Sequence, residues 1–138
     1  MRKGTKQDYL DERARDLMHN YRQVVREGVA TMNEAFQKTI MRPARRFYVS
    51  GDRAYHVLLR MRKMGMKALE GMTDEHRMMF CDLHAVVQRM RRSPIYRDSS
   101  LYSIIDLAVG KEAPRFYITV ETVKKVFYKW RKERRYLN

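Results

Sequence analysis

Two histidines and the single cysteine lie close together in the sequence, and such residues can bind a metal ion or form a nucleophile–base pair. They are His76, Cys81 and His84. On the helix that we expect there, Cys81 points away from both histidines, so the three side chains cannot share one metal ion without further ligands. Cys81 and His84 are spaced like a nucleophile and its base, but neither oxyanion donors nor an orienting acid accompany them. We therefore expect no metal site and interpret Cys81 as a small buried residue.

Other common signatures of catalysis are also missing from the sequence. It contains no glycine-rich phosphate loop and no pair of carboxylates in a recognisable catalytic setting. We therefore expect a protein that is not an enzyme and that uses no cofactor.

The strongest chemical signal is positive charge. The 138 residues include 30 Lys+Arg against 16 Asp+Glu, a formal net charge of +14, and the 44% hydrophobic content excludes a disordered basic tail. The polar start resembles no signal segment, and no apolar run approaches the roughly 18 residues of a membrane span. With one cysteine and no intramolecular disulfide, we expect a cytoplasmic protein.

The positive charge is concentrated in the last helix that we expect, which begins near Val120. A nearly uniform basic face would complement the phosphates of nucleic acid, with Thr122 and Lys125 at the helix start as candidate contacts to base edges. The structural alternative is a solvated face that gives solubility. Binding to an anionic membrane is not expected, because the apolar residues of this helix are needed for a core. The basic residues are Lys124, Lys125, Lys129, Arg131, Lys132, Arg134 and Arg135.

Two arginines precede pairs of aromatic residues in similar strings, and two interpretations remain open for them. In the structural interpretation, which we favour, each Phe of the strings packs inward and each Tyr keeps its hydroxyl at the surface. In the functional interpretation, Arg46 and Arg115 are phosphate clamps, or the two extended segments 46–49 and 115–118 pair as a short ribbon. Arg53 and Arg60, in the helix that follows the first string, are further candidates for contact with nucleic acid.

Apolar residues recur at helical spacing, and only six glycines and three prolines interrupt them, which predicts an all-α protein. Gly28 separates the first two periodic stretches, and Pro43 closes the second. Ser50 and Thr73 are typical helix caps. Either Ser99 or Ser100 can cap a short fifth helix, which Gly110 ends.

An internal repeat organises these elements. The string Ala44–Ser50 aligns without gaps on Ala113–Thr119, at an offset of half the chain length. The same register continues on both sides, with Met18 on Val87 and Val57 on Val126. We therefore predict two tandem three-helix repeats, 1–69 and 70–138, which pack together as one compact unit.

The second repeat carries a local resemblance to a known superfamily. The stretch Ile118–Phe127 resembles the start of the recognition helix in helix-turn-helix DNA-binding proteins, and Ser103–Ala108 resembles the helix before it. The resemblance covers residues 100–130. It implies that Val123 and Val126 are core residues, while Glu121, Thr122, Lys124 and Lys125 face the major groove. The connection from Val109 to Tyr117 is longer than the three or four residues usual in that motif.

Eleven methionines concentrate around the junction of the halves, and they predict either an apolar junction or an adaptable surface for a homodimer or protein partner. Together these features favour a non-enzymatic DNA-binding protein, such as a transcriptional regulator or a phage or mobile-element accessory factor. We expect DNA in preference to RNA. The alternative is an assembly factor of a nucleoprotein complex, with RNA or an acidic protein as partner.

Overall fold

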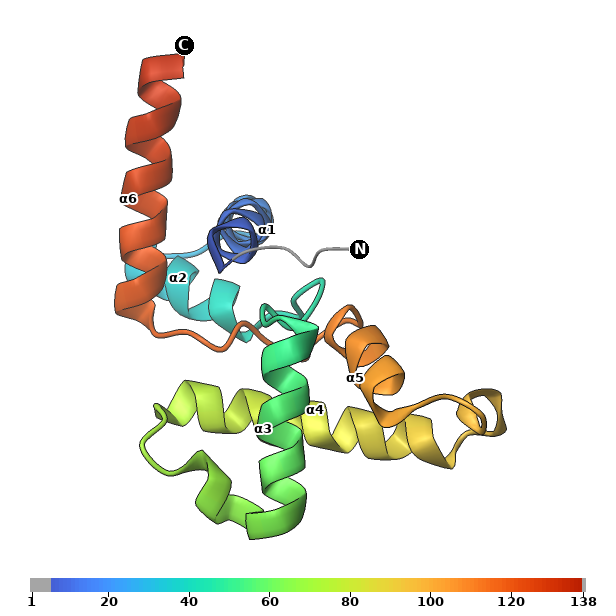
Figure 1. Ribbon diagram of the computed structural model, residues 1–138. Coiled ribbons are helices and arrows are strands. Elements are labelled where there is room, and N and C mark those ends of the chain that lie inside the picture. Colours follow the sequence, from blue (N-terminus) through green and yellow to red (C-terminus); the bar gives the residue numbers. More distant parts are fainter. Residues whose placement is uncertain (1–5, 138) are drawn as a thin grey trace.

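The computed structural model describes residues 6–137 and the side chains of residues 9–133. Its elements confirm the expected all-α class, because this part of the chain contains helices and a single β-bridge but no strand (Figure 1). The elements are α1 (Lys6–Glu27), α2 (Met32–Met41), α3 (Gly51–Met64), η1 (Gly65–Leu69), α4 (Asp74–Arg92), η2 (Pro94–Tyr96), α5 (Leu101–Val109) and α6 (Val120–Leu137).

Side-chain caps set where the later helices begin. A hydroxyl at each cap accepts a hydrogen bond from the backbone N–H three residues further on, which satisfies a donor that the first turn leaves unpaired. Ser50 and Thr73 are caps as predicted, and Ser100 rather than Ser99 caps α5. Gly28 lies directly after α1 with φ of +94°, a left-handed conformation that favours glycine. The residues with a capping hydroxyl are Thr31, Ser50, Thr73, Ser100 and Thr119.

The helices pack across the two halves of the chain. One group of helices consists of α1 and α2 from the first half and α6 from the second half. The other group consists of α4 and α5 from the second half and α3 from the first half (Figure 1). This differs from the expectation that each half closes a core with its own third helix. The division into 1–69 and 70–138 stays a prediction, since the two halves share their cores.

Each half of the chain packs its third helix on the other half, and two crossing segments explain this exchange of third helices. Residues 42–50 and 111–119 run antiparallel through the centre, where Ala44 and Ala113 form a β-bridge with two N–H···O bonds of 2.9 Å. The Phe47 N–H donates to the Val109 carbonyl, and the Phe116 N–H donates to the Ile40 carbonyl. Every partner in these bonds has its counterpart in the other half at the offset of the sequence repeat. The contacts therefore follow that offset, while duplication as the origin of the chain stays a prediction.

The aromatic residues of the two strings stack across the centre. Phe47 lies 6.0 Å from Tyr117 between ring centroids, and Tyr48 lies 5.7 Å from Phe116, with both ring pairs almost parallel. Both phenylalanines are fully buried, as expected. The predicted ribbon of 46–49 with 115–118 is replaced by one bridge two residues earlier in each segment, followed by these stacks.

We expected the tyrosine hydroxyls of the two strings to lie at the surface, but each is bonded to a carboxylate of the protein. The Tyr117 hydroxyl donates to Asp82 Oδ2 at 2.6 Å, and the Tyr48 hydroxyl donates to Asp16 Oδ2. Burial raises the pKa of both tyrosines above the ordinary value, and the hydrogen bonds to the carboxylates raise it further. The neutral tyrosines are therefore part of the folded centre.

These two tyrosines predict a loss of stability in alkali. The unfolded chain loses their protons near pH 10, whereas the folded chain keeps them to higher pH. The free energy of unfolding should therefore hold below about pH 10 and fall above it, by up to about 1.4 kcal/mol per pH unit for each tyrosine. Denaturant unfolding between pH 9 and 11 measures this decline, which should be shallower in a Tyr48→Phe/Tyr117→Phe variant. An equal decline in both proteins would contradict the prediction.

Candidate nucleic-acid interface

One face of α6 holds the helix on the first half of the chain. Val123 is fully buried, and Val126 and Phe127 are partly buried at the edge of the core. The Phe127 ring lies 4.9 Å from Tyr21 of α1 and 5.4 Å from Phe36 of α2, measured between centroids. The expectation that Val123 is a core residue is confirmed, but the core belongs to α1 and α2 instead of α5.

The opposite face of α6 is cationic and open to solvent. At 3.6 residues per turn, Tyr128 projects away from the apolar stripe, and its side chain is 53% exposed. Five cations surround this tyrosine, and all are exposed. They are Lys124, Lys125, Lys129, Arg131 and Lys132. The side chains of Arg134 and Arg135, counted in the same run, lie outside the described part of the chain.

Little of this charge is neutralised within the protein. Among the described side chains of α6, one ion pair is present, between Lys129 Nζ and Glu133 Oε1 at 4.0 Å. Lys125 and Lys129, four residues apart, are like charges on neighbouring turns, which lowers helix stability by about 0.2–0.5 kcal/mol. The cationic face therefore makes a small unfavourable contribution to folding, and a bound polyanion would remove it.

The first turn of α6 serves mainly to cap the helix. Thr122 donates its backbone N–H to Thr119 Oγ1, and its own hydroxyl lies 3.0 Å from the same oxygen. This arrangement engages the Thr122 hydroxyl that the sequence predicted as a contact to base edges. Lys125 is exposed one turn later and keeps its donors for a ligand.

The packing bears on the helix-turn-helix resemblance of residues 100–130. α5 packs against α3 and α4, whereas α6 packs against α1 and α2. The connection between them is buried at Phe116, Tyr117 and Ile118, because it crosses the centre of the molecule. The resemblance therefore does not extend to the way these two helices pack, and α2 takes the place beside α6 that the motif gives to α5.

Arg46 is engaged by its own chain. Its guanidinium lies 4.6 Å above the Tyr9 ring and 3.6 Å from Glu12 Oε2, and it donates to the carbonyls of Phe47 and Val49. These contacts hold the string of the first half against α1. They use the donors that a phosphate clamp would need, so Arg46 is not part of the interface that we propose.

The other candidate arginines are not brought to α6. Arg115 Nε donates to the Phe116 carbonyl at 3.5 Å, and its guanidinium lies 6.0 Å from the Tyr117 ring. Arg53 and Arg60 are exposed on α3, and the projecting part of α6 extends away from α3 (Figure 1). α6 therefore carries a continuous cationic face without them.

The residues of the metal and nucleophile hypotheses have other neighbours. Cys81 is partly exposed, and its Sγ lies 3.9 Å from Met66 Sδ. His84 Nε2 lies 3.2 Å from Gln88 Nε2. Within the described part of the chain, no three His, Cys, Asp or Glu side chains gather as a metal site.

The methionines divide between core and surface. Met79 and Met90 are buried, whereas Met64, Met66 and Met78 are 52%, 61% and 40% exposed. The burial of Met79 and Met90 agrees with the expected apolar junction. A partner that packs on the exposed methionines stays a prediction.

Comparison with protein families, curated proteins and solved structures finds no match to this chain. Among the described residues, no helix is both long and apolar enough to cross a membrane. The function proposed next is therefore inferred from the residues and contacts of the chain itself.

Sequence reasoning missed two features of the surface. Tyr128 was detectable, because helical spacing places it opposite Val123 and Val126 among the cations. Arg13, on α1, lines a pocket with Arg53 and His76. Nothing in the sequence signals this pocket, because its walls come from segments far apart in the chain.

Proposed function

We propose that the protein is a non-enzymatic DNA-binding protein that contacts the duplex through α6. The observation that carries this proposal is the exposed cationic face of α6, whose five described cations have a single ion pair among them. Each lysine or arginine that neutralises a phosphate releases condensed counterions, which favours binding. A cytoplasmic location is part of the same proposal.

A protruding helix favours duplex DNA over duplex RNA. The major groove of B-DNA is wide enough for an α-helix, whereas the major groove of A-form RNA is deep and narrow. The C-terminal part of α6 extends beyond α1 and α2, so a groove can receive it (Figure 1). All five cations then contact phosphates, and Lys125, at the helix start, also lies next to the base edges. A transcriptional regulator or a phage or mobile-element accessory factor would use such contacts.

The second candidate is an assembly factor for a nucleoprotein complex. The exposed Met64, Met66 and Met78 favour it, because flexible thioethers suit a protein partner. In this case the cationic face of α6 would contact RNA or an acidic protein, and the methionine surface would hold a protein partner or a second copy.

A competition experiment separates these functions. A labelled random DNA duplex is titrated with the protein at low salt, and unlabelled duplex DNA, duplex RNA of equal length and polyglutamate compete for it. The DNA proposal predicts that duplex DNA competes best. Stronger competition by RNA or polyglutamate would favour the assembly factor, and absence of duplex binding at low salt would exclude the DNA proposal.

A further inference from the structure

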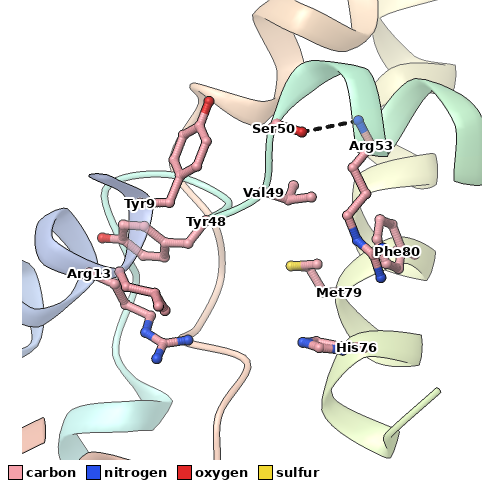
Figure 2. A pocket seen from close by; sticks show the side chains of 10 residues that line it. Tyr9, Arg13, Tyr48, Val49, Ser50, Arg53, His76, Met79 and Phe80 are labelled. Carbon is pink, nitrogen blue, oxygen red and sulfur yellow. Dashed lines mark hydrogen bonds between the residues drawn. The ribbon is translucent and has the colours of Figure 1, made fainter. Parts of the chain in front are cut away.

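A pocket of about 400 Å³ lies away from the cationic face of α6, in the size range of ligand sites (Figure 2). Its walls are formed by α1, the segment before α3, the start of α3, and α4. Leu10, Val49 and Met79 make parts of the wall apolar, and the ring of Tyr48 adds a flat surface. The Phe80 ring lies beneath the Arg53 guanidinium, which is 5.8 Å from the ring centroid. A ligand with an apolar, flat body would therefore lose water on several sides.

Three basic side chains line this pocket. Arg13 approaches it from α1, Arg53 from α3 and His76 from α4, as Figure 2 shows. None of the described residues that line the pocket is an aspartate or a glutamate. Asp16, which lies near Tyr48, is already engaged by the Tyr48 hydroxyl and by Arg45 at 3.5 Å. The pocket therefore presents positive groups without a carboxylate of its own.

Arg13 is the group that most needs a ligand. Its Nε is buried and has no hydrogen-bond partner in the described structure, although most buried polar atoms in proteins are satisfied. Burial lowers the pKa of the Arg13 guanidinium, because desolvation disfavours the charged form. An anion beside this guanidinium would supply a compensating charge.

The second half of the chain has no arginine at the positions that correspond to Arg13 and Arg53. The repeat offset, which the central hydrogen bonds follow, relates Arg13 to Asp82 and Arg53 to Thr122. Asp82 accepts a hydrogen bond from Tyr117, and Thr122 belongs to the cap of α6. The equivalent positions of the second half thus carry no cation, whereas the first half has an arginine at each of the two positions.

We propose that this pocket binds a small organic anion that has a phosphate, sulfonate or carboxylate group on a flat apolar body. The Arg13 guanidinium pairs with the anionic group, and Arg53 adds charge from the opposite wall. The flat body packs against Leu10, Tyr48 and Met79. This site goes beyond the proposed DNA contact, because none of its lining residues comes from α6.

Phenyl phosphate and inorganic phosphate are suitable probes for this site. In a ¹⁵N-labelled full-length protein, phenyl phosphate should shift the Nε–H resonance of Arg13 saturably. It should bind at least about tenfold more tightly than inorganic phosphate, because burial of the ring adds to the charge interaction. Equal affinities, or shifts confined to the α6 lysines with the Arg13 resonance unmoved, would overturn the proposal.

Variants separate the pocket from the general attraction of a basic protein for anions. Arg13→Gln should weaken phenyl phosphate binding about tenfold or more, because a charge-assisted hydrogen bond is lost. Arg53 is exposed, and Arg53→Gln should weaken binding in the same direction, so the test stands even if Arg13→Gln fails to fold. Lys132→Gln on α6 removes the same charge and should leave phenyl phosphate affinity unchanged. Equal weakening by Lys132→Gln and Arg53→Gln would contradict the site.

Discussion

A variant with Lys124, Lys125 and Lys129 replaced by glutamate is expected to bind a random DNA duplex about a thousandfold more weakly than the unmodified protein at 50 mM salt. Three phosphate contacts are lost, and three carboxylates then repel the backbone. All three side chains are exposed on α6, so their replacement leaves the core intact. Fluorescence anisotropy of a labelled duplex measures the affinity, and circular dichroism verifies that the variant remains folded.

A matched control distinguishes α6 from net charge alone. Arg62, Lys63 and Lys67 are also exposed, and they lie in α3 and η1, away from α6. Replacing these three by glutamate changes the net charge by the same amount and should weaken duplex binding only slightly, through the long-range field. If both triple variants lose affinity equally, α6 is not the contact surface.

The packing of α6 against α2 predicts the largest effect on stability. Phe36 is fully buried, and its ring meets Phe127 edge-on at 5.4 Å between centroids. Phe36→Ala should lower the free energy of unfolding by about 3–5 kcal/mol, because it removes buried surface and leaves a cavity. Denaturant unfolding of Phe36→Ala, Phe127→Ala and the double variant measures the coupling energy between the two rings. We expect this coupling energy to be about 0.5–1.5 kcal/mol.

Lys132→Ala serves as the control for this cycle. Its side chain is exposed on the same helix, so we expect a change within about 0.5 kcal/mol of the unmodified protein. Strictly additive effects of Phe36→Ala and Phe127→Ala would contradict the packing of α6 on the first half of the chain.

The helices were predictable because their signals are local. Apolar spacing marks one face of each helix, and cap residues such as Ser50 and Thr73 mark where helices begin. The exchange of third helices was not predictable in this way, since periodicity tells which face of a helix is buried and not which helix covers it. The long connection from Val109 to Tyr117 was the only hint, because a segment of that length can cross the molecule.

At the candidate interface too, some features could be predicted from local sequence and others depend on the folded chain. Exposure of Lys124, Lys125 and Arg131 follows from their spacing relative to Val123, so it could be predicted from α6 alone. The engagement of Arg46 could not, because its partners Tyr9 and Glu12 lie far upstream and meet it only in the folded chain. The pocket at Arg13 needed the folded structure for the same reason.

The salt dependence of duplex binding tests the central claim most directly. If the five exposed cations of α6 each neutralise one phosphate, the logarithm of the association constant should fall with the logarithm of the salt concentration with a slope of about −4 to −5. The α6 triple variant should show a slope shallower by about three. A slope near zero for the unmodified protein, or no binding to a random duplex even at low salt, would contradict the account.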